Sequence, residues 1–276
     1  MQEETKVYQG LMPLSDEEYR KVDAINASGL RTLVTKTPFH YVYEKANPRK
    51  ETSSTIFGTY VHHVVLENGL SKFTPSPHCD RRTKDGKALA EAHAKECAEK
   101  GLISIDSEDY ESLAQIDKEA KTNKLFQILL SNPEAIKERA VFATHADGFL
   151  MKGKVDLVMS HDGEIILCDL KTSESIDAQD FSRSIYNYGY HSQMAFYDML
   201  LAMNGMKPTR HLIAAIENKQ PHCFRVFEIE PEAIEAGRVA IHHGLAEYAK
   251  CKKTNTWPNY QDDIVSIGLP GFANTF

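Results

Sequence analysis

The sequence predicts an α/β (α+β) fold in which a mixed central β-sheet is flanked by helices. Three observations lead to this prediction. Apolar residues recur at helical spacing through most of the first 130 residues, three strand-like runs follow between residues 139 and 171, and a helix, two strands and a helix complete the pattern. The sequence shows no internal repeat and no linker, so residues 1–276 are expected to form one domain.

The N-terminal part, residues 1–130, is predicted to be mostly helical. A short helix is expected at residues 28–35, with Ser28 or Asn26 as its cap. Longer helices are expected at residues 55–70, 84–100 and 107–130. Gly101 is a plausible end for the second of these, and a serine cap with acidic residues in the first turn begins the third.

The following part, residues 131–250, is predicted to hold the catalytic sheet and its flanking helices. Strands are expected at residues 139–146, 149–160, 163–171, 211–217 and 222–228. Helices are expected at residues 181–204 and 231–250, the second opening with Pro231 in its first turn. Residues 251–276 are expected to be an irregular tail.

Composition limits the classes of function. The net charge is -7, whereas a protein that only coats nucleic acid is usually basic, so any contact with DNA must use local positive charge. An odd count of five cysteines, none in a CxxC pair, disfavours a disulfide framework and a zinc or iron–sulfur site. No apolar run approaches the ~18 residues that span a bilayer, and no signal peptide is visible. A cytoplasmic protein with no membrane partner is therefore expected.

The segment from Gly153 to Ser173 carries the most chemical information. Asp162-Gly163 is typical of a two-residue hairpin turn between apolar runs, and it sets His161 opposite Glu164. In that register Asp156 lies opposite Asp169, and Lys154 lies opposite Lys171, with all four side chains on one face of the hairpin.

Directly opposed like charges destabilise a hairpin, but a cation between the two carboxylates would remove the conflict. Mg²⁺ binds through one or two carboxylates together with phosphate oxygens. The alternative is a solvated strand face with alternating charges. Asp169, however, follows the apolar run Ile165–Cys168, which is typical of a buried central strand, and charges at the end of such a strand are more often functional.

At this point the residues resemble a known family. Asp156, with Asp169-Leu170-Lys171 thirteen residues further on, resembles the PD-(D/E)xK nuclease signature. The segment from Gly58 to His62 resembles the GTxxH motif of RecB-like members, and Gln193 with Tyr197 resembles their QxxxY motif. More specifically, the chain is similar to the C-terminal nuclease domain of the phage-type exodeoxyribonuclease VIII (RecE) family. The similarity runs in order from INASGLRTLVTKTPFHY to WPNY…IGLP and covers nearly the whole chain.

The resemblance implies a restriction-endonuclease-like core, Mg²⁺ dependence (with Mn²⁺ as a substitute) and 5′-to-3′ digestion of linear double-stranded DNA. It also implies 3′ single-stranded tails for recombination through a partner annealing protein, and a ring-shaped homo-oligomer. Asp156 and Asp169 are then metal ligands, joined by the backbone carbonyl of Leu170, and Lys171 is catalytic. His62 is the upstream catalytic residue close to the metal.

Several assignments keep an alternative. His62 and His63 point about 100° apart on a helix, so only one should face the metal; the motif favours His62, whereas His63 shares a helical face with Glu67. Gln193 and Tyr197 are DNA-contacting or supporting residues by resemblance, yet their spacing also fits an ordinary helix surface.

The densest basic cluster is either a DNA clamp or a solvated charge run. It comprises Arg81, Arg82, Lys84 and Lys87.

Two other functions compete with a DNA exonuclease. One is a structure-selective or single-strand nuclease of the same superfamily. The other is a non-catalytic DNA-binding module with a decayed nuclease fold, which the intact Asp156, Asp169 and Lys171 argue against.

Overall fold

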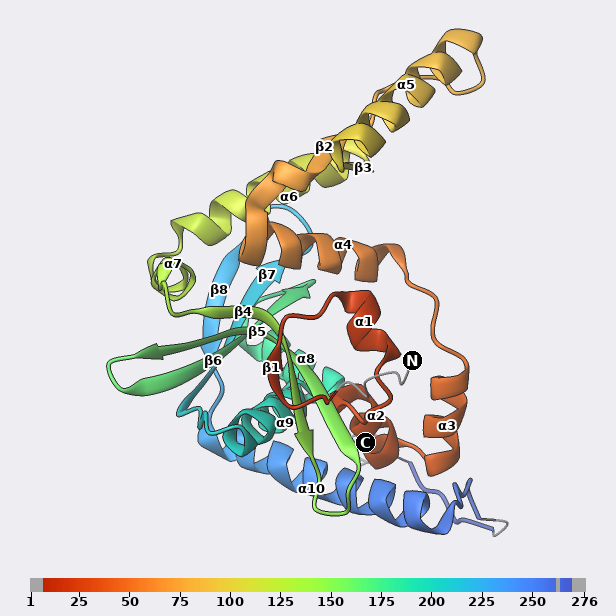
Figure 1. The fold of residues 1–276 in the computed structure, drawn as a ribbon, viewed down its shortest axis with the longest axis vertical. Coiled ribbons are helices and arrows are strands. Elements are labelled where there is room, and N and C mark those ends of the chain that lie inside the picture. The colour runs from red at the N-terminus through yellow and green to blue at the C-terminus, as the bar shows by residue number, and fades with distance from the viewer. Residues whose placement is uncertain (1–6, 262–263, 270–276) are drawn as a thin grey trace, which may run out of the picture.

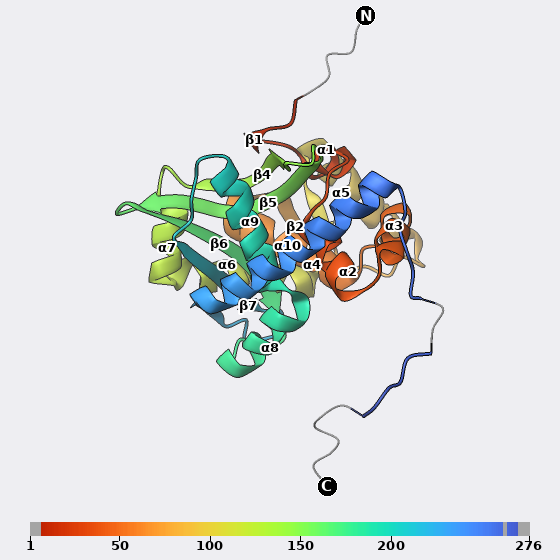
Figure 2. The same ribbon diagram turned by 90° about the horizontal axis from the view of Figure 1, so that it is seen from below.

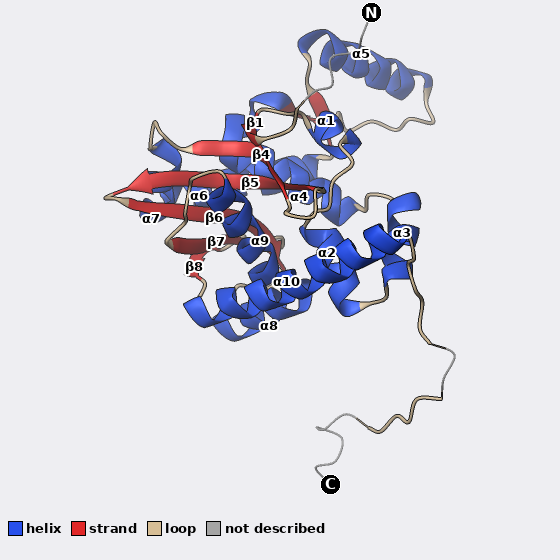
Figure 3. Cartoon of the chain, turned by 60° about the horizontal axis from the view of Figure 1, so that its bottom comes forward, coloured by secondary structure: helices blue, strands red, loops and turns tan. Residues whose placement is uncertain are grey.

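A six-stranded mixed sheet separates the helices into two layers (Figures 1 and 3). The computed structural model describes residues 7–261 and 264–269. The strand order is β1-β4-β5-β6-β7-β8; β6 and β7 are parallel, and the other neighbours are antiparallel. The strands are β1 (Gly10–Met12), β4 (Ile136–Thr144), β5 (Leu150–His161), β6 (Glu164–Ser173), β7 (Arg210–Glu217) and β8 (Phe224–Glu228). The predicted mixed sheet flanked by helices is thereby confirmed.

Each face of the sheet has its own apolar core. One core joins the sheet to α2 (Ala27–Thr35), α9 (Tyr190–Met203) and α10 (Pro231–Thr254), and Figure 2 shows α10 running across this face. The other core joins the opposite face to α4 (Ser53–His62), α6 (Ser107–Thr122) and α7 (Lys124–Ser131). None of the helices in the described residues combines the length and the apolar character needed to cross a bilayer.

The N-terminal part contains elements that periodicity did not predict. These are β1, which pairs with β4, and the short helices α1 (Asp16–Lys21) and α3 (Pro38–Ala46). The helix predicted at residues 28–35 is present, and its cap is Asn26, whose side chain accepts a hydrogen bond from the Gly29 N–H. The first 30 residues thus supply a sheet edge as well as helices.

The single helix predicted at residues 55–70 is wrong in its second half. The α-helix α4 ends at His62 and continues as a π-helix over His63–Asn68, followed by a 3₁₀ turn over Gly69–Lys72. Gly69 adopts φ +61, a left-handed conformation that ends the regular spiral. π-helical turns occur frequently at functional sites, and this one follows directly after the histidine of the motif.

An arm projects from the body of the protein (Figure 1). It consists of β2 (Phe73–Pro75), α5 (Lys84–Lys100) and β3 (Ile103–Ile105), and β2 and β3 pair in a separate parallel two-stranded sheet at its base. The predicted helix and its stop at Gly101, which has φ +64, are both confirmed. A helix of this length spans about 25 Å, so the start of α5 lies far from the base of the arm.

Two other predicted helices are each broken in two. The helix predicted at residues 107–130 divides at Asn123, because the Asn123 side chain caps α7 by accepting the Phe126 N–H. Its first half is capped by Asp106 rather than by the predicted serine. The helix predicted at residues 181–204 divides into α8 (Ala178–Tyr188) and α9 at Gly189, whose φ is +71.

The predicted hairpin is confirmed. Asp162 and Gly163 both adopt positive φ, +51 and +81, as a two-residue hairpin turn requires. Paired residues run from His161 with Glu164 to Leu157 with Cys168, which is the predicted register. The final helix extends to Thr254, beyond its predicted end, and the last part of the predicted tail lies outside the described residues.

Candidate active site

A pocket of about 990 Å³ opens where the two structural halves meet. The N-terminal half contributes α4 and the π-helix, and the sheet contributes β4, β5 and the end of β6. The far wall comes from α8 and the start of α9. His62 and Asp156, both predicted site residues, line this pocket.

Asp156 is anchored to the neighbouring strand by its own carboxylate. The side chain is on β5 and is 7% exposed, and its Oδ2 accepts a hydrogen bond of 2.7 Å from the Leu170 N–H on β6. Burial, together with the nearby Asp169 carboxylate, raises the pKa of Asp156 to about 7. A buried carboxyl with so high a pKa gains free energy from a cation that binds beside it.

Asp169 and Lys171 form a close ion pair on β6. Lys171 Nζ lies 2.5 Å from Asp169 Oδ2 and 5.0 Å from the centroid of the Tyr190 ring. Burial alone would lower the pKa of Lys171, but the carboxylates of Asp169 and Asp156 outweigh it and raise that pKa. Lys171 is therefore held as a charged ammonium next to the carboxylates.

His62 is the histidine that contacts the buried carboxylates. Its Nδ1 lies 3.6 Å from Asp156 Oδ2 and 3.4 Å from Glu138 Oε1. The dense packing around the ring would lower the pKa of His62, but the two carboxylates outweigh this effect and raise it. His63 also lines the pocket, because the π-helix widens the turn, but it pairs with Glu67 at 2.9 Å instead.

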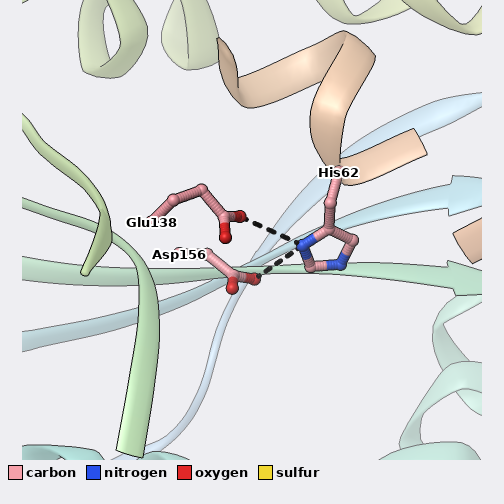
Figure 4. Close-up of side chains that lie close together, drawn as sticks. All are labelled: His62, Glu138 and Asp156. Atoms are coloured by element: carbon pink, nitrogen blue, oxygen red, sulfur yellow. Dashed lines mark hydrogen bonds and ion pairs between the residues drawn. The ribbon is translucent and has the colours of Figure 1, made fainter. Parts of the chain in front are cut away.

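Glu138 belongs to this cluster and was not predicted from the sequence. Figure 4 shows His62, Glu138 and Asp156 pointing toward one another. The backbone of Glu138 adopts φ +46, which is rare for a residue with a side chain. Its neighbours Lys137 and Arg139 pair with β5, whereas Glu138 itself is not one of the paired residues. One signal was available: in the β4–β5 register, Glu138 stands opposite Asp156. The sequence did not define this register, because the connection at residues 145–149 is not a two-residue turn and Glu138 lies just before the strand predicted at residues 139–146.

Lys154 supports the Glu138 carboxylate. Its Nζ lies 2.6 Å from Glu138 Oε2 and 2.7 Å from Asp16 Oδ1. The opposed lysines of the predicted hairpin therefore each have separate carboxylate partners, Lys154 with Glu138 and Lys171 with Asp169. Burial raises the pKa of Glu138, but hydrogen bonds from His62 and Lys154 outweigh it and lower that pKa.

The donor atoms of His62, Glu138 and Asp156 fit a divalent cation. One ligand atom from each residue lies within 4.8 Å of the other two, and two of the three are hard carboxylate oxygens. The set also includes an imidazole nitrogen, which Mn²⁺ and other transition ions accept readily. The predicted roles of Asp169 and of the Leu170 carbonyl as ligands remain predictions, since this three-residue cluster includes neither.

Gln193 and Tyr197 lie in a second, smaller pocket next to the first. The Gln193 Nε2 donates a hydrogen bond of 2.8 Å to the Tyr197 hydroxyl, and the Tyr197 side chain is buried. This pocket of about 200 Å³ also includes Arg31 and Lys152, and it shares Tyr188 with the larger pocket. The two motif residues are thus adjacent to the carboxylates but do not line the same cavity.

The basic cluster is not brought to either pocket. Arg81, Arg82 and Lys84 lie at the start of α5, on the projecting arm. Arg82 donates two hydrogen bonds to Asp80, of 2.9 and 3.0 Å, which offset part of its charge. A DNA contact by this cluster remains a prediction, and it would have to occur well away from the carboxylates.

Comparison with known proteins agrees with this arrangement. Residues 28–267 match a family model described as a PDDEXK-like domain of unknown function (DUF3799). The matched span includes His62, Glu138, Asp156, Asp169 and Lys171. A search of curated proteins finds no match.

Solved structures share the fold. A protein from Eubacterium rectale described as a "putative exonuclease" superposes with a TM-score of 0.60 at 16% identity, over 96% of this chain and 98% of that one. A phage-related exonuclease from Haemophilus somnus 129PT gives a TM-score of 0.32 at 12% identity, over 84% of this chain and 96% of that one. At such low identities, the first likeness shows that the overall fold is shared across nearly the whole chain.

Proposed function

Because the chain belongs to the family of PDDEXK-like domains whose model matches residues 28–267, we propose that it is a Mg²⁺-dependent nuclease that degrades linear double-stranded DNA from its ends. The observation that carries the proposal is the cluster of His62, Glu138 and Asp156, with the Asp169–Lys171 ion pair beside it. This arrangement places the carboxylates of Glu138 and Asp156 in the pocket and a charged amine close to them, which suits metal-assisted phosphodiester hydrolysis.

The side chains of the site have two proposed roles, which are binding of a cation and electrostatic stabilisation of the reacting phosphate. A divalent cation in this cluster would supply Lewis-acid polarisation of a phosphate oxygen. Asp156 is held in place by the Leu170 N–H, and Lys154 holds Glu138, so both carboxylates are oriented before any ligand arrives. Lys171 stays charged and opposes the negative charge that develops on the phosphate. Its raised pKa favours this role over that of a general base.

The smaller pocket supports a nucleic-acid substrate. Its lining includes two cationic side chains, Arg31 and Lys152, and no carboxylate. Lys152 donates hydrogen bonds to the carbonyls of Tyr19 and Val22, whereas Arg31 donates through Nη2 to the carbonyl of Asn187. The remaining guanidinium donors of Arg31 and the second amide hydrogen of Gln193, which have no hydrogen-bond partner among the described residues, suit a phosphate oxygen. We assign to this pocket a second phosphate of the strand being cut.

The finer aspects of the activity are proposed by resemblance to RecE-type nucleases. They are 5′-to-3′ polarity, production of 3′ single-stranded tails for a partner annealing protein, and a ring-shaped homo-oligomer around the duplex. The arm that carries Arg81, Arg82 and Lys84 would then contact the DNA backbone, or a second copy of the chain, outside the pocket.

The decisive experiment compares linear and circular duplex DNA with and without Mg²⁺. The wild-type protein and an Asp169→Ala variant are incubated with both substrates, and Asp109→Ala, an exposed carboxylate on α6, serves as the matched control. We expect the wild type and the control to degrade linear DNA only, and only with Mg²⁺. Equal cutting of circles would favour a structure-selective or single-strand nuclease. DNA binding without any cutting would favour a non-catalytic module.

Polarity is measured separately with a duplex that is labelled at one end of one strand. We expect a label at the 5′ end of a strand to be released early. A label at the 3′ end of the same strand, in a second substrate, should be released last. Release of the 3′ label first would overturn the proposed polarity while leaving the nuclease assignment intact.

A further inference from the structure

Tyr188 occupies the boundary between the two pockets. Its side chain lines both the large pocket with the carboxylates and the small pocket with Arg31. Although it belongs to a pocket wall, Tyr188 is 60% exposed. Among residues 7–261 and 264–269, no hydrogen bond holds its hydroxyl group. A large aromatic ring that is accessible at the edge of a polar cavity is suited to stacking against another flat ring.

The local backbone fixes the position of this ring. Tyr188 is the last residue of α8, and Tyr190 is the first residue of α9. Gly189 between them adopts φ +71 and joins the two helices without a loop. The Tyr188 and Tyr190 rings stack with centroids 5.7 Å apart and planes inclined by 27°. One face of Tyr188 therefore rests on a ring that is itself held over Lys171.

These observations, taken with the proposed function on which this inference rests, lead to one assignment. We infer that Tyr188 stacks on an unpaired nucleobase of the strand being cut. If one phosphate lies at the carboxylates and a neighbouring phosphate lies at Arg31, the nucleoside between them passes Tyr188. Every base except the terminal one is covered on both faces in a duplex, so a base at the second or third position reaches the ring only after it leaves the helical stack.

For a base at the second or third position, the assignment implies that the end of the duplex opens before cleavage. Aromatic stacking tolerates every base, so the site would accept any sequence, as an end-degrading nuclease needs. Tyr188 would therefore differ from Gln193 and Arg31 in its ligand. Those two side chains would contact a phosphate of the DNA backbone, so removing a base should not change their contacts.

The contact between the Tyr188 ring and the base is tested by removing each of them separately and then both together. Duplexes carry an abasic nucleotide at the first, second or third position of the cut strand, and affinity is measured by fluorescence anisotropy with Ca²⁺ replacing Mg²⁺. For the wild type, we expect loss of one of these bases to weaken binding by about five-fold or more, the range of one stacked base. The Tyr188→Ala variant should bind the intact duplex with an affinity lowered by the same factor. Removal of that base should then lower the affinity of the variant no further.

Two variants complete the test. Tyr188→Phe should behave as the wild type does, because the ring is retained, and Tyr43→Ala removes a ring of similar exposure, 59%, on α3. The inference is overturned if Tyr188→Ala and the wild type lose equal affinity at every abasic position. If the wild type binds no duplex end at all, the proposed function fails and the inference fails with it, which is a separate and recognisable outcome.

Discussion

The Asp156 carboxylate accepts the backbone N–H of Leu170 at 2.7 Å, and this bond joins the two strands that carry the candidate site. The pairing of β5 with β6 ends one residue earlier, at Leu157 and Cys168, and beyond that point the Asp156 side chain supplies a hydrogen bond between the two strands. Asp156 is thereby fixed between Asp169 and Lys171, the two residues that flank Leu170. The carboxylate therefore orients the site and also closes the sheet at this point.

The contribution of Asp156 to the stability of the metal-free protein should fall as pH rises from about 4 to about 7, whereas the lowered pKa of Glu138 acts in the opposite direction near the lower end of this window. The pKa of Asp156 is raised to about 7, against about 3.9 for an unfolded Asp, so in this window the unfolded state gives up a proton that the folded state keeps. The change is on the order of 3–4 kcal/mol for this group alone. The raised pKa of His62 acts in the same direction at higher pH, because its stabilising proton is lost as pH passes that pKa.

Thermal unfolding at pH 5.5 and pH 8, with EDTA or with Mg²⁺, measures this effect. We expect Mg²⁺ to stabilise the protein much more at pH 8, where it does not compete with protons for the carboxylates. Asp156→Asn should remove most of the pH dependence and most of the Mg²⁺ effect. Equal Mg²⁺ stabilisation at both pH values would contradict the prediction.

Glu138→Gln should weaken metal binding although the sequence motif omits this residue. Glu138 contacts His62 through one carboxylate oxygen and Lys154 through the other, so replacing the carboxylate with an amide removes a negative charge from the cluster. Titration calorimetry with Mn²⁺ should show affinity lowered by about ten-fold or more. The control is Glu134→Gln, an exposed residue just before β4, which should bind as the wild type does. A Glu138→Gln variant with unchanged affinity would exclude Glu138 from the cation site.

The contrast between Asp156 and Glu138 shows what could be predicted from the sequence. The Asp162-Gly163 turn is local and its predicted register holds as far as Leu157 and Cys168, so the closeness of Asp156 and Asp169 was predictable, although they are not themselves a pair of the ladder. Glu138 reaches the site through a left-handed backbone conformation on β4, which no periodic pattern encodes. Likewise, the breaks at Asn123 and Gly189 depend on single capping or positive-φ residues inside otherwise continuous helical patterns.

Tyr190→Leu should reduce kcat on linear DNA. The ring face lies 5.0 Å from Lys171 Nζ and helps to hold the ammonium beside Asp169. Loss of a partly buried cation–π contact of up to ~2 kcal/mol corresponds to a decrease of up to roughly thirty-fold. Tyr190→Phe keeps the ring and should retain most of the rate, and Tyr43→Leu should leave it unchanged. A Phe variant as slow as the Leu variant would show that the hydroxyl matters rather than the ring.

Gly237→Ala should destabilise the protein, although alanine is the better helix former by about 1 kcal/mol. Gly237 lies within α10, where a Cβ would stand 2.5 Å from the carbonyl oxygen of His191 and 3.0 Å from the Cβ of Ala195 on α9. Because the nearer atom belongs to the backbone, the helices must separate, at a cost of about 1–3 kcal/mol.

Urea unfolding of Gly237→Ala should show a lower midpoint at an unchanged slope. The control Val239→Ala, at a position 64% exposed on the same helix, should change stability by less than ~0.5 kcal/mol. Since α9 also carries Tyr190, Gln193 and Tyr197, displacement of this helix should lower nuclease activity as well. A Gly237→Ala variant as stable as the wild type would show that helix propensity outweighs the close packing of α9 and α10.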